Sequence, residues 1–274
     1  MKKTMIILAA VGMAACTKVN FVNERDVHFS IKGDFGSPTF SRATLNSENM
    51  TDLWLVDYMG GELKQCVHLT TEDAGFSSPT LTMEYGQHHV YIVASRGVEP
   101  VVDNAAHTIV WSSPRDTFWK DATVNVTATA GSSSVTLDRV VSRLRVVVTD
   151  KVPEGSTTFN MSASKWYNGI DYLSGQPVAE EAVSRNVSIP GSYIGTVGQL
   201  SVSFFCFSGT EEWTTNITVS VMDANGDAIS SKNISNAPFF RNRSTDYSGM
   251  MFASSSGMML TLNADWATPV TATF

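Results

Sequence analysis

The sequence predicts an all-β protein in which antiparallel β-sandwiches follow one another along the chain. The composition favours Ser, Thr, Val, Gly and aromatic residues over Ala, Leu, Glu and Lys, as is typical of strands and turns. Apolar residues recur at every second position in many short segments. Loops rich in Gly, Ser and Pro separate these segments at the spacing expected of a sandwich.

The expected strands differ in how deeply they should be buried. In the first one, Val27, Phe29 and Ile31 share one face, and polar residues occupy the other. Residues 53–58 and 89–95 carry apolar side chains on both faces. That pattern is typical of strands in the middle of a packed sheet.

The later part of the chain carries the same alternation with a clear turn. Residues 217–221 alternate between apolar and polar, and Asn225-Gly226 follows them as a strong hairpin signal. Only residues 179–184 suggest a helical turn or two. We therefore expect almost no helix.

The domain boundary is expected near the middle of the chain. Residues 135–149 form the longest strand-like run, and a turn with Pro153 and Gly155 follows it. This predicts an N-terminal sandwich over residues 27–150 and a C-terminal one over residues 151–274. One larger sandwich is the alternative.

The amino end has the pattern of a bacterial lipoprotein leader. Residues 1–15 combine two lysines, a short apolar stretch and a small-residue cleavage site, followed directly by Cys16. The apolar stretch is shorter than the roughly 20 residues needed to cross a bilayer. We expect a signal peptide over residues 1–15, a lipidated Cys16 and a linker over residues 16–26. An ordinary secreted protein with a free Cys16 is the alternative.

Composition and motifs exclude several classes of function. The 43% hydrophobic content excludes disorder as the main state. The net charge is -7 and the 19 Lys and Arg residues form no cluster, so we expect no nucleic acid partner. No nucleophile elbow, phosphate loop or dinucleotide motif is present, so we expect neither an enzyme nor a cofactor. Cys66 and His68 would share a strand face, but two ligands do not make a metal site, and none is expected.

One aromatic stretch, residues 165–172, is a candidate binding surface. Trp166, Tyr167 and Tyr172 stand beside Asn, Asp and Gly, a combination suited to stacking on a sugar. The alternative is that these rings cover the end of a sandwich.

The order and spacing of several segments resemble the fimbrillin superfamily of Bacteroidetes. They are the lipobox at Cys16, RVVSRLRVVV at residues 139–148 and PFFRNRSTDYSGMMF at residues 238–252. Residues 53–63 and 88–97 are more similar to FimB-type anchor and accessory subunits than to FimA-type stalk pilins.

The resemblance implies a pilus subunit with two transthyretin-like β-sandwiches, carried to the cell outer membrane as a lipoprotein. It implies other fimbrial subunits as partners, host or bacterial surface ligands, and a role in cell adhesion. In stalk pilins of this family a protease cuts after an Arg and removes the first strand, so that a strand from the next subunit can replace it. Here this implies processing between Arg42 and Ala43, and complementation at Val27, Phe29 and Ile31.

Three hypotheses follow from the sequence. The leading one is a lipid-anchored fimbrial subunit, of the anchor or accessory kind. The second is a surface lipoprotein that binds glycans through residues 166–172. The third, an extracytoplasmic hydrolase, has no motif in its favour.

Overall fold

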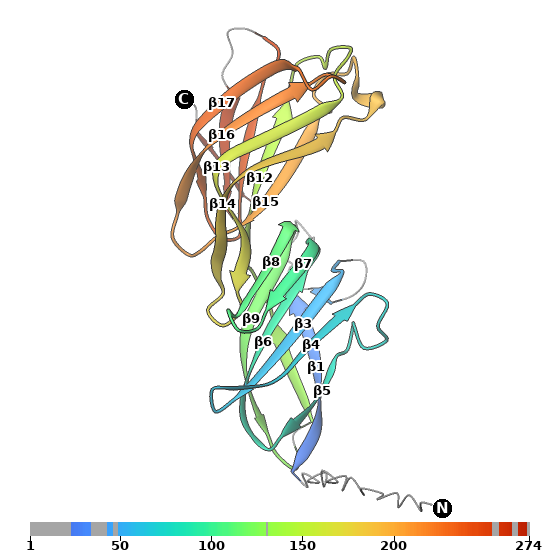
Figure 1. Cartoon of the computed structure of the whole chain (residues 1–274), viewed down its shortest axis with the longest axis vertical. Helices are drawn as coiled ribbons and strands as arrows, with labels where there is room; N and C mark the ends of the chain where they lie inside the picture. Colours follow the sequence, from blue (N-terminus) through green and yellow to red (C-terminus); the bar gives the residue numbers. More distant parts are fainter. Residues whose placement is uncertain are drawn as a thin grey trace, which may run out of the picture.

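A computed structural model of the chain describes residues 23–33, 43–45, 49–129, 131–253, 258–264 and 268–272. Within these ranges the chain forms strands and one 3-10 helix, η1 (Gly191–Tyr193), and the predicted all-β sandwich fold is confirmed. Figure 1 shows two lobes stacked along the long axis of the molecule. The expected leader, Cys16 and Arg42 lie outside the described residues.

The N-terminal sandwich consists of two sheets. Sheet A contains β1 (Glu24–Gly33), β2 (Ala43–Thr44), β5 (Thr80–Glu84) and β10 (Ser132–Thr136), and sheet B contains β3 (Asp52–Met59), β4 (Glu62–Thr70), β6 (Gly86–Ser95), β9 (Thr117–Val126) and β11 (Asp138–Arg139). Strand β1 begins within the stretch expected to be a linker. Strands β3 and β6 lie inside sheet B, as their apolar faces predicted.

The C-terminal sandwich also consists of two sheets. Sheet D has the order β15 (Ser201–Phe207), β12 (Val141–Val148), β18 (Arg243–Gly249), β19 (Met258–Ala264) and β20 (Thr268–Ala272). Sheet C has the order β17 (Ala228–Phe239), β16 (Trp213–Met222), β13 (Thr158–Asp171), β8 (Thr108–Ser113) and β7 (Val98–Asp103), and β14 (Gln176–Ser188) also pairs with β13. Most pairs are antiparallel, but β1 with β10 and β12 with β18 are parallel. Residues 179–184 belong to β14 and form no helical turn.

The crossing between the two sandwiches comes earlier than the expected boundary after residue 150. The run over residues 135–149 is not one strand, because β10 ends in sheet A, β11 pairs in sheet B, and β12 enters sheet D. The chain thus changes sheets twice within an uninterrupted apolar pattern. Alternation alone cannot show such a change, since each piece buries one face in its own sheet.

A third core joins the sandwiches, in addition to the core inside each of them. The β7–β8 hairpin comes from the first half of the chain, yet β8 pairs with the end of β13 and so extends sheet C. Buried side chains from both halves meet there, and they are Trp54, Val56, Val93, Ile109, Trp111, Val140, Val141, Ile170, Tyr172 and Phe207. The joint is therefore packed like a core.

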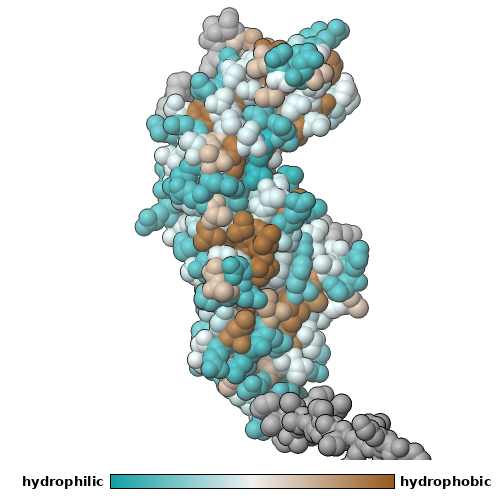
Figure 2. Space-filling view, viewed as in Figure 1, coloured by the Kyte–Doolittle hydropathy of each residue, from teal (hydrophilic) through white to brown (hydrophobic). Residues whose placement is uncertain are grey.

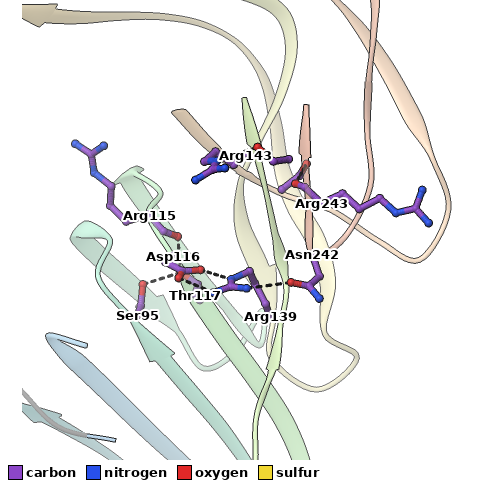
Figure 3. Close-up of polar contacts among 10 residues, drawn as sticks. Ser95, Arg115, Asp116, Thr117, Arg139, Arg143, Asn242 and Arg243 are labelled. Atoms are coloured by element: carbon purple, nitrogen blue, oxygen red, sulfur yellow. Dashed lines mark hydrogen bonds and ion pairs between the residues drawn. The ribbon is translucent and has the colours of Figure 1, made fainter. Parts of the chain in front are cut away.

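A buried arginine adds a polar clamp at this joint (Figure 3). Arg139 is 7% exposed, and its guanidinium donates to the Asp116 carboxylate at 2.6 and 3.0 Å. It also donates to the Asn242 side-chain oxygen at 3.1 Å. Asp116 precedes β9 of the N-terminal sandwich, and Asn242 precedes β18 of the C-terminal one. The Arg139 side chain thus forms hydrogen bonds to residues of both sandwiches.

Hydrophobic side chains gather on the surface at the level of the β7–β8 hairpin (Figure 2). Strand β7 carries three exposed valines, Val98, Val101 and Val102, which are 45%, 67% and 37% exposed. Strand β7 is a free edge of sheet C, but Pro100 offers no backbone N–H, and Glu99 has a φ of 51°. Both features oppose the addition of a further strand at this edge.

Among the residues that the structure describes, none forms a helix of the length and hydrophobicity needed to cross a membrane.

Candidate functional site

The first strand, β1, lies in the middle of its sheet rather than at an edge. On one side, residues from His28 to Lys32 pair with β10 in parallel. On the other side, residues from Glu24 to His28 pair with β5, and Lys32 and Gly33 pair with β2, both antiparallel. Strand β1 therefore satisfies backbone groups of neighbouring strands on both of its sides.

The inward face of β1 fills the core of the N-terminal sandwich. Val27, Phe29 and Ile31 are 2%, 1% and 0% exposed and belong to one buried cluster. The residues between them, His28 and Ser30, are exposed. The predicted register of this strand is thus the one in the structure, because a slip by one residue would exchange the two faces.

Polar contacts fix β1 along its outward face and its ends. The His28 ring lies 2.7 Å from the Thr80 hydroxyl, and the Thr82 hydroxyl donates to the Asp26 carboxylate at 2.7 Å. The Arg25 guanidinium donates to the backbone carbonyl of Ala128. Strand β1 is therefore held by its backbone, its core face and its exposed face.

The chain leaves β1 and returns immediately beside it. Ala43 begins β2 and pairs with Gly33 at the end of β1. Arg42 lies outside the described residues, so the structure places only one side of the expected processing position. A cut between Arg42 and Ala43 would leave the new chain end next to the place that β1 fills.

At the other end of the chain, β20 pairs with β19 in sheet D. Val270 and Ala272 lie in this hairpin, paired with Leu262 and Leu260. In this structure the segment completes its own sheet.

The predicted glycan platform does not exist as such, because two of its three rings are buried. Trp166 and Tyr172 are both 0% exposed. The Trp166 indole donates to the carbonyl of Phe205 at 3.0 Å, and the Tyr172 hydroxyl donates to Asn104 at 3.3 Å. The prediction that these two rings contact a glycan is therefore wrong, because both rings are packed among buried core residues.

A β-bulge explains which rings are buried. The register of β13 against β14 shifts between Ala163 and Trp166. Before the shift the odd-numbered residues Phe159 and Met161 face the core, and after it the even-numbered Trp166 and Ile170 do. The bulge turns Tyr167 to the outer face, where it is half-buried.

The sequence singled out two further side chains, Cys66 and His68. The His68 ring stacks on Trp54 with centroids 4.4 Å apart and lies 2.8 Å from the Asp52 carboxylate. Cys66 and Cys206 are both free thiols, and burial raises the pKa of each. Across the described part of the chain, no three His, Cys, Asp or Glu side chains are grouped as a metal ion would require.

The fold of this chain is shared with solved bacterial proteins. A candidate polysaccharide-binding protein (DUF1812) from Bacteroides thetaiotaomicron has a TM-score of 0.58 and 10% identity, with 90% of this chain and 98% of that one covered. A candidate adhesin from the same species has a TM-score of 0.56 and 12% identity, with 91% and 98% covered. A fimbrial assembly protein from Parabacteroides distasonis has a TM-score of 0.50 and 12% identity, with 91% and 99% covered.

These likenesses show a common fold. The chain belongs to the family described as "Family of unknown function (DUF6562)", whose model matches residues 84–274. No curated protein matches the sequence. The family match begins after β1, so the first strand and its groove rest on the structure alone.

Proposed function

We propose that this protein is a lipid-anchored fimbrial subunit of the bacterial outer membrane, of the anchor or accessory kind. It joins other fimbrial subunits by β-strand complementation and supports cell adhesion. The observation that carries the proposal is the place of β1, in the middle of sheet A with three side chains in the core. The fold shared with a fimbrial assembly protein and a candidate adhesin supports it.

The physical basis is that β1 can be replaced by another strand of the same pattern. Without β1, β10 and β5 would each lose a paired neighbour, and a groove the length of three buried side chains would open. An incoming strand satisfies the backbone groups, and its alternate apolar side chains set the register. The incoming strand would run parallel to β10 and antiparallel to β5, as β1 does.

Strand complementation is tested by removing β1 and supplying it again. We expect a chain without residues 17–42 to be less stable than the full chain and to bind a synthetic peptide of residues 24–33. At roughly 1.5–3 kcal/mol for each fully buried apolar side chain, the peptide should raise the melting temperature by several degrees. The measurement is thermal melting of the truncated chain with and without peptide.

Two controls make the result decisive. A peptide with Val27, Phe29 and Ile31 changed to Ser should not restore stability, because the backbone edge alone does not set a register. The full chain should not bind either peptide, since its groove is filled. Equal effects of both peptides, or an unchanged melting temperature after truncation, would rule out complementation at this strand.

The lipid anchor is tested at Cys16. We expect Cys16→Ser to release the protein from the membrane fraction, because a diacylglyceryl group with an added acyl chain provides stable binding. The measurement is fractionation of cells that express each form, with a high-salt wash to remove proteins held only by charge. If Cys16→Ser remained with washed membranes, the protein would not be a lipoprotein anchored at this residue.

A further inference from the structure

Tyr167, the outward ring of the aromatic stretch, forms one wall of a surface pocket. The pocket has a volume of about 400 Å³ and lies between the end of β13, the start of β14 and the loop from β15 to β16. Its lining residues are Tyr167, Gln176, Pro177, Gly209, Thr210, Glu211, Glu212 and Trp213. This combination of rings, an amide, a hydroxyl and carboxylates is suited to a ligand with both an apolar face and hydroxyl groups.

The aromatic wall is held in place by contacts behind it. The rings of Tyr167 and Trp213 meet edge to face with centroids 5.1 Å apart, and Phe239 stacks on Trp213 at 4.8 Å. The Trp213 indole donates to the Ser208 hydroxyl at 3.1 Å, and the Tyr167 hydroxyl donates to the Glu180 carboxylate at 2.7 Å. Since both polar atoms have partners within the protein, the rings offer a fixed apolar surface to the pocket.

The loop before β16 brings polar groups to the pocket that remain available for a ligand. Thr210, Glu211 and Glu212 are exposed, and their side chains make no hydrogen bond or ion pair to the part of the chain that the structure describes. The loop that carries them is fixed at its base, where Arg241 donates to the carbonyl of Ser208 at 3.0 Å. These groups can therefore accept or donate hydrogen bonds without first breaking internal ones.

The charge around the pocket selects against anionic ligands. Glu180, Glu211 and Glu212 lie at or beside it, and the nearby Lys165 is already paired with Glu180. Its ammonium lies 3.4 Å from the Glu180 carboxylate and 5.1 Å from the centre of the Tyr167 ring. A ligand that carries its own carboxylate or sulfate would meet the two carboxylates of Glu211 and Glu212, which outnumber the one remaining cation beside the pocket, the Arg241 guanidinium at the base of the loop.

We propose that this pocket binds a neutral pyranose residue of a surface polysaccharide. The C–H face of the sugar would lie against Tyr167 and Trp213, and its hydroxyls would donate to Glu211 and Glu212 and exchange hydrogen bonds with Gln176. This site is separate from the groove of β1 and lies in the C-terminal sandwich. Binding here requires no strand exchange.

The test is binding of the full mature chain to a printed array of neutral and acidic glycans, followed by calorimetric titration of the best neutral oligosaccharide. We expect neutral glycans to be retained and their sialylated or uronate-containing relatives to be rejected. Tyr167→Ala should weaken binding at least tenfold, and so should the double variant Glu211→Gln with Glu212→Gln. The double variant keeps the size of both exposed side chains, so a loss of binding cannot be attributed to unfolding.

The matched control is Glu72→Gln with Glu154→Gln, two exposed glutamates elsewhere on the surface, which should leave binding unchanged. The proposal is overturned if no neutral glycan binds, if the pocket variants bind as well as the original, or if oligolysine binds the pocket in place of a sugar. Because array binding requires neither assembly nor a lipid, a negative result would leave strand complementation as it stands.

Discussion

Val219→Asp is expected to unfold the C-terminal sandwich at temperatures where the original protein is folded. Val219 is 0% exposed in the main core, and β16, which carries it, pairs with β13 on one side and β17 on the other. A carboxylate at this position has no partner, so the free energy of unfolding should fall by more than about 4 kcal/mol. Chemical denaturation followed by circular dichroism measures the difference.

The neighbouring residue supplies the control. Thr218 lies on the other face of β16, half-exposed, and its hydroxyl donates to the Asn233 side chain at 2.9 Å. Thr218→Asp loses only this hydrogen bond, so the cost should stay near 1 kcal/mol. If both substitutions lowered stability equally, the register of β16 would be off by one residue.

The alternation of apolar and polar residues correctly predicted the strands that stay in one sheet without a shift in register. Val27, Phe29 and Ile31 face the core as expected. The Asn225-Gly226 hairpin between β16 and β17 is also confirmed, with a φ of 86° at Gly226. These features depend on local periodicity and turn chemistry, which a sequence shows directly.

Two irregularities account for what alternation missed. The bulge after Ala163 exchanges the faces of β13, and so Trp166 became a core residue while Tyr167 turned outward. Tyr172 follows the end of β13 and is buried as well. The break after Thr136 sends one apolar run into three sheets. Neither position carries a Gly or Pro, the residues that mark such breaks in a sequence.

The pocket could not be predicted from the sequence for a different reason. Tyr167 and Trp213 are far apart in the chain, and they meet only because β13 pairs with β16 and the β15–β16 loop folds back beside β14. To predict this contact, one must know which strands pair with each other over the whole chain. The apolar pattern of each single strand does not show that.

Arg139→Ala is expected to destabilise the joint between the sandwiches by about 3–5 kcal/mol. The substitution removes both hydrogen bonds to Asp116 and the one to Asn242, and it leaves the Asp116 carboxylate without its cation. The Arg139 guanidinium also lies 4.6 Å from the centre of the Phe118 ring, and that contact is lost as well. Hydrogen exchange should rise at the amides around Asp116 and Asn242, which lie on opposite sides of the joint.

An exposed ion pair on the same sheet separates the clamp from a general effect of charge. Lys120 lies 2.8 Å from Asp138, with side chains 41% and 62% exposed, so Lys120→Ala should cost less than about 1 kcal/mol. In a double-mutant cycle, Asp116→Ala should remove much of the penalty of Arg139→Ala, because the carboxylate left behind is then gone. If Arg139→Ala and Lys120→Ala cost the same, or if Arg139→Ala and Asp116→Ala were additive, Arg139 would be no clamp. The apolar contacts of the third core would then hold the two sandwiches together by themselves.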